Sequence, residues 1–141
     1  MLIGVVSDTH NRVDHVKEIV NIFNEYEVEL VIHTGDITNS QTLQYFQKLK
    51  CPLKGVFGNN DLNEIGLEEI CLENNFDFKL PPYVISLENK KIAIFHEPDL
   101  ICSILEEQRI LIWCYTAILI DIETKILRAL STLIQVNVQE V

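Results

Sequence analysis

Short apolar segments, each followed at once by polar residues, constrain this chain more than any other feature of its sequence. The first, residues 2–6, is rich in β-branched side chains and carries no charge, which is typical of a strand buried on both faces. It leads directly into Ser7-Asp8-Thr9-His10. In extended backbone the side chains at positions i and i+2 lie on the same side, so Asp8 and His10 can reach one ion. Alone this pair is weak evidence, because a loop Asp also commonly caps the next helix.

The same arrangement recurs three times along the chain. Taken singly, the later clusters predict only turns, because Gly, Asn and Asp are common turn residues. Their repetition after successive buried strands favours a shared site instead. The segments, each with the polar residues that follow it, are 30–34 with Gly35-Asp36, 52–57 with Gly58-Asn59-Asn60-Asp61, and 91–95 with His96.

Helical periodicity separates the first three of these strands. Residues 11–24 place an apolar stripe on one face, and residues 41–49 form a second helix for which Ser40 is the expected cap. Residues 67–72 are a shorter helical candidate, and residues 83–87 pair with 91–95 as a hairpin. Strands that alternate with helices predict an α/β fold with a parallel sheet.

Ligands of such sheets bind at the carboxyl ends of the strands. We therefore expect Asp8, His10, Asp36 and Asn59 to converge at one edge, with His96 delivered there by a fourth strand. His33 lies inside a strand, so a hydrogen-bonded core residue is the favoured interpretation of this histidine.

Length, charge and cysteine content narrow the class of protein. At 141 residues, about half of them apolar, the chain is expected to form a single domain. A net charge of −10 argues against nucleic acid or an anionic membrane as a partner and suits the binding of divalent cations. The longest uncharged apolar run, residues 110–120, is too short to cross a bilayer. We expect a cytoplasmic protein with reduced thiols at Cys51, Cys71, Cys102 and Cys114.

Together these motifs resemble, in order and context, those of the calcineurin-like metallophosphoesterases. Over residues 1–105 the chain is most similar to the small archaeal and bacterial phosphodiesterases of the YfcE type. The resemblance implies a metallophosphoesterase-like β-sandwich with flanking helices. It also implies two divalent ions, Mn, Ni, Fe or Zn, which activate water for attack on a small phosphate-ester substrate.

The resemblance implies a role for each motif residue. Asp8 and His10 would bind the first ion, Asp36 would bridge both ions, and Asn59 and His96 would bind the second. Asn60 is the predicted catalytic residue. Many relatives have a histidine at the Asn60 position, where it can donate a proton. An asparagine cannot do so at neutral pH, which indicates diesters or activated esters with good leaving groups.

The chain departs from the family pattern after His96. Glu97-Pro98 follows this histidine where the family usually has Gly, and the Gly-His-x-His block that gives one ligand to each metal is missing. No histidine occurs after His96. We predict weaker metal binding and low or absent turnover, with a non-catalytic protein-interaction scaffold of the same fold as the alternative. The sequence leaves the oligomeric state open, with a homo-oligomer among the alternatives.

We hypothesise that residues 106–141 are translated out of frame. When each codon starts on the third base of the preceding one, the codons from Trp113 permit Val-Leu-Tyr-Gly-His-Thr-His-Arg. The same shift over residues 132–141 permits Ile-Asn-Pro-Gly-Glu-Cys-Ser-Gly, which is similar to the closing strand and turn of the family. The alternative is a divergent tail, and sequencing the coding DNA distinguishes the two.

Overall fold

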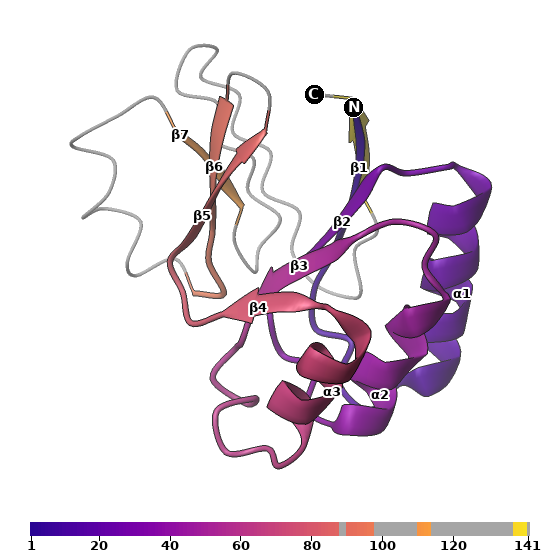
Figure 1. The fold of residues 1–141 in the computed structure, drawn as a ribbon, viewed down its shortest axis with the longest axis vertical. Coiled ribbons are helices and arrows are strands. Elements are labelled where there is room, and N and C mark those ends of the chain that lie inside the picture. Colours follow the sequence, from indigo (N-terminus) through magenta and orange to yellow (C-terminus); the bar gives the residue numbers. More distant parts are fainter. Residues whose placement is uncertain (88–89, 98–109, 114–136, 141) are drawn as a thin grey trace.

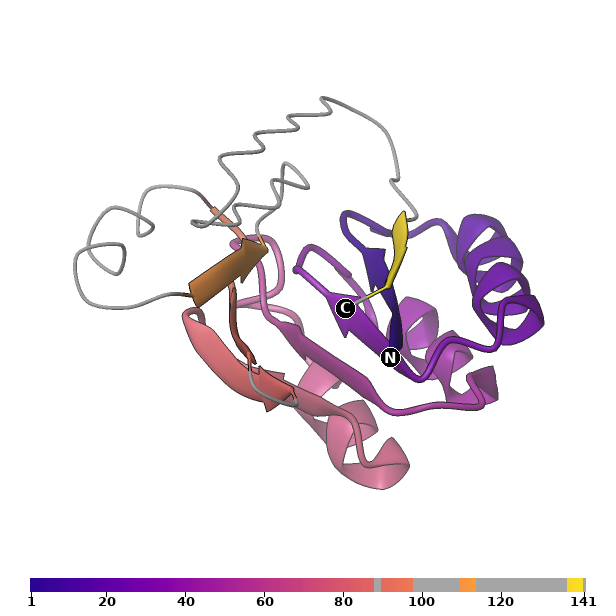
Figure 2. The same cartoon turned by 90° about the horizontal axis from the view of Figure 1, so that it is seen from above.

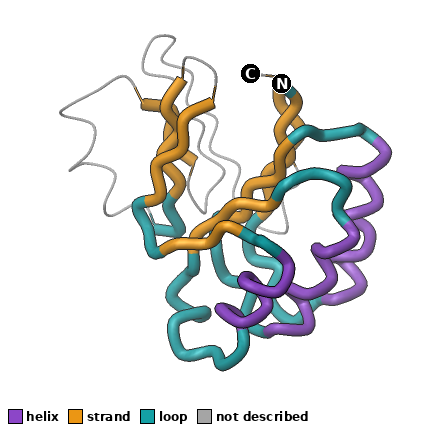
Figure 3. Tube along the Cα trace, viewed as in Figure 1, coloured by secondary structure: helices purple, strands orange, loops and turns teal. Residues whose placement is uncertain are grey.

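The fold was analysed in a computed structural model, which describes residues 1–87, 90–97, 110–113 and 137–140. Figures 1 and 3 show strands and helices that alternate in the first part of the chain. In chain order the elements are β1 (Leu2–Val6), α1 (Val13–Glu25), β2 (Leu30–His33), α2 (Ser40–Tyr45), the 3₁₀ turn η1 (Phe46–Lys48), β3 (Leu53–Val56), α3 (Leu67–Asn74), β4 (Asp77–Lys79), β5 (Tyr83–Leu87), β6 (Lys90–Ile94), β7 (Ile110–Trp113) and β8 (Asn137–Glu140).

The larger sheet has the strand order β4-β3-β2-β1-β8. Strands β1 to β4 are parallel, with Ile3 opposite Leu30 and His33 opposite Gly55. Strand β8 runs antiparallel to β1. The predicted parallel sheet is therefore confirmed for the three strands that carry the first three motifs. Strand β4 was not expected, because it is three residues long and has a charged residue at each end.

The smaller sheet has the order β5-β6-β7. The predicted hairpin is present, since β5 and β6 pair antiparallel from Tyr83 opposite Ile94 to Leu87 opposite Lys90. Strand β7 pairs parallel with β6 and comes from the start of the apolar run 110–120. The rest of that run lies outside the described residues, as does most of the segment hypothesised to be out of frame.

The two sheets pack face to face, and the helices cover the outer face of the larger one (Figures 1 and 2). Alternation along β1 explains this arrangement, because successive side chains of a strand point to opposite faces. Ile3 and Val5 lie in the cluster between the sheets, whereas Val6 lies in the cluster beneath the helices. The expected sandwich with flanking helices, an α/β fold, is confirmed.

The helices follow the predicted pattern with one correction. Helix α1 buries Val16, Ile19, Val20 and Phe23, the expected apolar stripe. The expected Ser40 cap of α2 is wrong, because Asn39 is the N-cap and its side chain accepts a hydrogen bond of 2.7 Å from the Thr42 amide. Ser40 instead forms the first residue of the helix, which ends at Tyr45 and continues as η1 instead of running on to residue 49.

Two further expectations concern the cysteines and membranes. Cys71 is buried, Cys51 is half-buried, and both are free thiols, while Cys102 and Cys114 lie outside the described residues. Burial raises the pKa of the Cys71 thiol to about 12 and also raises that of Cys51. In the part of the chain that the structure describes, no helix has the length and hydropathy to cross a membrane.

Candidate metal centre

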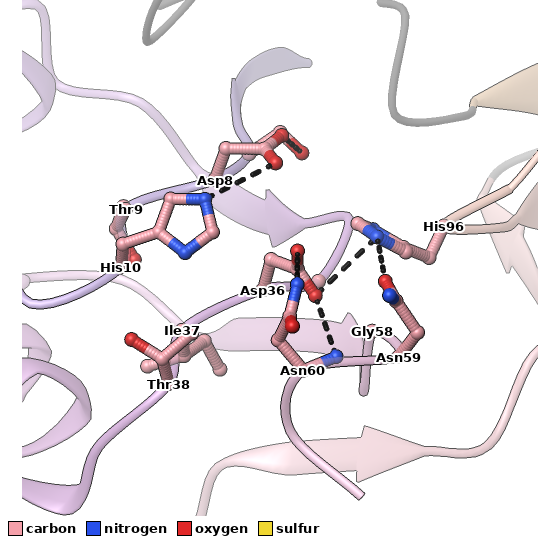
Figure 4. Close-up of polar contacts among 12 residues, drawn as sticks. Asp8, Thr9, His10, Asp36, Ile37, Thr38, Gly58, Asn59, Asn60 and His96 are labelled. Atoms are coloured by element: carbon pink, nitrogen blue, oxygen red, sulfur yellow. Dashed lines mark hydrogen bonds and ion pairs between the residues drawn. The ribbon is translucent and has the colours of Figure 1, made fainter.

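The polar motifs meet where strands from both sheets end. Asp8 and His10 follow β1, Asp36 follows β2, and Asn59 follows β3. His96 follows β6 of the smaller sheet and completes the group (Figure 4). The expected convergence of these five side chains is therefore found, and their roles as metal ligands stay predictions.

Asp8, His10 and Asp36 form the first donor cluster. One potential ligand atom from each lies within 4.8 Å of the others. The nearest contact between Asp8 and His10 is 3.7 Å, from Oδ1 to Nε2. Burial raises the pKa of the Asp8 carboxyl, while a hydrogen bond from the Ser7 hydroxyl opposes this shift. Two carboxylates and an imidazole gathered in this way suit a divalent cation, which would stabilise the buried negative charge.

Asp36, Asn59 and His96 form a second donor cluster. The His96 Nδ1 atom lies 3.0 Å from the Thr34 carbonyl oxygen, which can only accept, so Nδ1 donates this hydrogen bond. In the neutral ring, Nε2 then carries a lone pair. This atom is 3.0 Å from Asn59 Oδ1 and 3.3 Å from Asp36 Oδ1. A cation bound at this point would contact all three atoms, and the backbone contact of Nδ1 is the orientation typical of metal-binding histidines.

Asn60 holds the carboxylate that the two clusters share. Its backbone amide donates to Asp36 Oδ1 at 3.1 Å, and its side-chain amide donates to Asp36 Oδ2 at 2.6 Å. Asn60 itself is exposed and lies beside Asp36 and Asn59 (Figure 4). The predicted catalytic residue therefore lies at the site, although nothing in the structure tests its role in a reaction.

The backbone of these loops is strained. Asp8, His10, Asp36 and Thr38 all have positive φ angles, of 55°, 41°, 59° and 65° respectively. Such conformations are unfavourable for residues with a side chain, and they concentrate at functional sites whose surroundings hold them in place. This strain is a second observation, independent of the donor types, that indicates a functional site here.

Two glycines allow the loops to approach each other. A Cβ atom on Gly58 would lie 2.2 Å from Asp36 Oδ1. A Cβ atom on Gly35 would lie 2.8 Å from both the Gly58 nitrogen and His96 Nδ1, and Gly35 also has a φ of 109°. Since real Cβ atoms are not found at such distances, both positions require glycine for the clusters to close as they do.

His33 confirms the interpretation of a hydrogen-bonded core histidine. The Gly35 amide donates to its Nδ1 at 3.0 Å, so Nε2 carries the proton and donates to the Thr9 hydroxyl at 3.0 Å. Burial lowers the pKa of His33 to about 3, and the charges of His96 and His10 contribute. This neutral ring joins the loop after β1 to the loop after β2.

Sequence reasoning missed the contribution of Asp61, whose carboxylate accepts backbone hydrogen bonds from both neighbouring loops. The signal was present in the sequence: an Asp three residues after Gly58 can accept a hydrogen bond from that amide, as side chains in turns often do. The bonds to the preceding loop depend on tertiary contacts and carry no sequence signal.

The residues present fit the metal ions that the earlier resemblance implies. Both clusters offer mixed oxygen and nitrogen donors, which suit Mn, Fe, Ni or Zn better than Ca. Asp36 belongs to both clusters, as a bridging carboxylate must. The segment that would hold the missing Gly-His-x-His block lies mostly outside the described residues.

Comparison with known proteins identifies the class that this fold and site define. The family model of the calcineurin-like phosphoesterase superfamily domain matches residues 1–112. The chain belongs to this superfamily. The match ends at Ile112, inside the segment 106–141 that is hypothesised to be out of frame.

The chain is similar to archaeal members of the superfamily. A phosphodiesterase of Methanocaldococcus jannaschii is 30% identical over 97 residues, which are 68% of this chain and 58% of that protein. A probable metallophosphoesterase of the same organism is 40% identical over 82 residues, 57% of this chain and 41% of that protein. The chain thus spans less than two thirds of the length of these relatives.

Solved structures support the same assignment. The structure of an archaeal phosphodiesterase has a TM-score of 0.65 and 30% identity, and the match covers 75% of this chain and 64% of that one. The Escherichia coli phosphoesterase YfcE has a TM-score of 0.53 at 16% identity, covering 70% of this chain and 58% of that one. At this identity the second likeness shows a shared fold alone.

Proposed function

We propose that this chain is a divalent-metal-dependent phosphodiesterase whose centre holds two ions. The first ion would be bound by Asp8, His10 and Asp36, and the second by Asp36, Asn59 and His96. The observation that carries the proposal is the sharing of Asp36 between two separate groups of nitrogen and oxygen donors. A superfamily whose relatives are named as phosphodiesterases supports the reaction class.

The ions, when bound, would supply a water of lowered pKa and neutralise the charge that develops on the phosphate. The residues of the chain hold and orient the groups that would bind these ions. Asp36 holds both donor groups at one carboxylate, and Thr34 fixes the ring of His96. Asn59 and Asn60 are exposed, so a substrate can reach this side of the centre.

The presence of an asparagine at position 60 favours diesters over monoesters as substrates. Its side-chain amide can donate a hydrogen bond to a phosphate oxygen but cannot transfer a proton to the leaving alkoxide. A leaving group must therefore depart without a proton from this position, which favours esters of acidic alcohols. We propose a small phosphodiester of this kind as the substrate.

We further propose that the chain as printed is impaired. Each donor group contains three side chains, and the chain has no histidine after His96 to complete either one. Loss of outer partners of metal ligands alone typically costs about 10–100-fold in affinity or activity. Loss of one ligand from each ion should cost at least as much.

A matched pair of proteins tests both parts of the proposal. One is the 141-residue chain as printed. The other is encoded with the codons from residue 113 read in the shifted frame, so that Gly-His-Thr-His follows. Both would be titrated with Mn²⁺ and assayed with bis-p-nitrophenyl phosphate, with Asp36→Asn in each as the inactive control.

We expect the printed chain to bind Mn²⁺ measurably. The reframed chain should have an Mn²⁺ affinity and a rate of ester hydrolysis that are each about tenfold or more higher. Equal rates in the two proteins would contradict the impairment. Absence of activity in both, with Asp36→Asn unchanged from its parent, would contradict the phosphodiesterase itself.

The missing block favours one other function, a protein-interaction scaffold with a degraded metal site. A scaffold would retain little metal after purification, whereas the proposed enzyme would retain Mn²⁺ or another transition metal that Asp36→Asn releases. Metal content measured on both proteins separates these two functions.

A further inference from the structure

Asp61 has surroundings unlike those of any other carboxylate described here. It is 4% exposed and accepts hydrogen bonds from backbone amides only. Its Oδ2 atom accepts from the Asp36 and Gly58 amides at 2.8 Å each. Its Oδ1 atom accepts from the Ile37 and Thr38 amides at 2.7 Å each. The side chain thus joins the loop after β2 to the turn after β3.

The three amides of the β2 loop converge on this carboxylate because the backbone there has an unusual conformation. Asp36 and Thr38 both have positive φ angles, and for a β-branched residue such as Thr38 this is a genuine outlier. Successive amides that point inward in this way form a concave anion-binding nest. The Asp61 carboxylate is the anion in the nest, and its charge-assisted hydrogen bonds offset the strain.

The same stretch of backbone carries the central residue of the metal site. The side chain of Asp36 leaves the nest toward His96 Nε2, 3.3 Å away, and belongs to both donor clusters. On the other side, the Gly58 amide is bonded to Asp61 immediately before Asn59. Rotation of the Asp36 backbone would therefore move its carboxylate relative to donors from every other loop.

We propose that Asp61 is a positioning residue that fixes the direction of the Asp36 carboxylate and the spacing of the two donor clusters. It acts through the backbone and does not itself touch a metal ion or a substrate. This inference rests on the proposed function, since it assigns Asp61 a role in forming that metal site.

Asp61→Asn tests the inference with an almost isosteric change. An asparagine has one acceptor oxygen, so in either orientation its NH₂ group faces two amide donors in place of an acceptor. Two of the four hydrogen bonds are lost, and the NH₂ group of the asparagine faces two backbone N–H groups that are also donors. We expect the folded variant to bind Mn²⁺ about 10–100-fold more weakly than the parent, as for other residues that orient metal ligands.

Two controls separate positioning from general destabilisation. Glu64→Gln makes the same acid-to-amide change at an exposed position near Asp61 and should leave Mn²⁺ affinity unchanged. Asp77→Asn removes the partner of Lys54, 2.6 Å away and remote from the site. It should lower the free energy of unfolding without changing Mn²⁺ affinity.

The measurement is an Mn²⁺ titration of the full chain at a temperature at which circular dichroism shows each variant to be folded. Asp61→Ala, which admits water to the nest, replaces Asp61→Asn if the latter does not fold, and its affinity should also fall about tenfold or more. A folded Asp61 variant with the Mn²⁺ affinity of the parent would overturn the inference while leaving the proposed function intact. A parent chain that binds no Mn²⁺ would overturn the proposed function, and the inference with it.

Discussion

Acidification should destabilise this protein through the buried histidine His33. Its Nδ1 atom accepts from the Gly35 amide and its Nε2 atom donates to Thr9, so the ring must be neutral to keep both bonds. Burial is the main cause that lowers its pKa to about 3 in the folded protein, from 6.5 for an ordinary histidine. Below pH 6.5 the unfolded chain therefore binds a proton that the folded chain excludes.

The sign and size of the effect follow from this difference. The contribution of His33 to the free energy of unfolding is nearly constant above pH 6.5. It falls as the pH decreases below 6.5 and levels off near pH 3. The slope approaches about 1.4 kcal/mol per pH unit, so His33 alone should remove about 1.4 kcal/mol between pH 7.5 and 5.5. The full loss near pH 3 is about 5 kcal/mol, a large part of the stability of a small domain.

A comparison with His33→Asn isolates this contribution. An asparagine keeps an acceptor for the Gly35 amide but does not titrate, and all other ionisable groups are common to both proteins. Urea unfolding, followed by circular dichroism in excess chelator at pH 7.5 and 5.5, would give both free energies. The parent should lose about 1.4 kcal/mol relative to the variant on this acidification. An unchanged difference between parent and variant would refute the assignment of a neutral, buried His33.

Three further predictions concern packing and the site. Gly58→Ala would place a Cβ atom 2.2 Å from Asp36 Oδ1. Titration with Mn²⁺ should therefore show a loss of affinity of about tenfold or more. An unchanged affinity would mean that the loops can move apart. Gly4→Ala would place a Cβ atom 2.7 Å from the Phe23 ring and should cost about 1–3 kcal/mol in urea unfolding, less when combined with Phe23→Leu. In the reframed chain, Asn60→His supplies a proton donor and should raise the ratio of p-nitrophenyl phosphate to bis-p-nitrophenyl phosphate hydrolysis; a constant ratio would contradict the role given to Asn60.

The sheet and the convergence of the motifs could be predicted because they depend on local patterns. Uncharged β-branched segments indicate buried strands, helical periodicity separates them, and parallel strands present their carboxyl ends at one edge. From the sequence alone, these rules place Asp8, Asp36 and Asn59 at one edge of the sheet. His96 could be added because its strand follows the same pattern, although it arrives from the second sheet.

The features that could not be predicted depend on contacts between distant segments. Strand β4 is too short and polar to show a pattern, and pairing with β3 defines it. The cap of α2 went to Asn39 instead of Ser40 because both are good capping residues and backbone conformation decides between them. The hydrogen bonds of Asp61 and His33 to other loops form only in the folded chain. Asp61 bonds to residues 23 to 25 positions away, and His33 bonds to Thr9, 24 positions away.

The Asp36 carboxylate is held by residues that precede the part of the chain in which the fifth motif is missing. Asn60 donates two hydrogen bonds to this carboxylate, and the Asp36 backbone amide donates to Asp61. The hydrogen bonds that tie the β1 loop to its neighbour, through Thr9 and His33, also come from residues before that part of the chain. The hypothesised change of reading frame beyond residue 97 would therefore leave these contacts of Asp36, Thr9 and His33 in place. Under the proposed function, we therefore expect the missing histidines to lower metal affinity without displacing the Asp36 carboxylate.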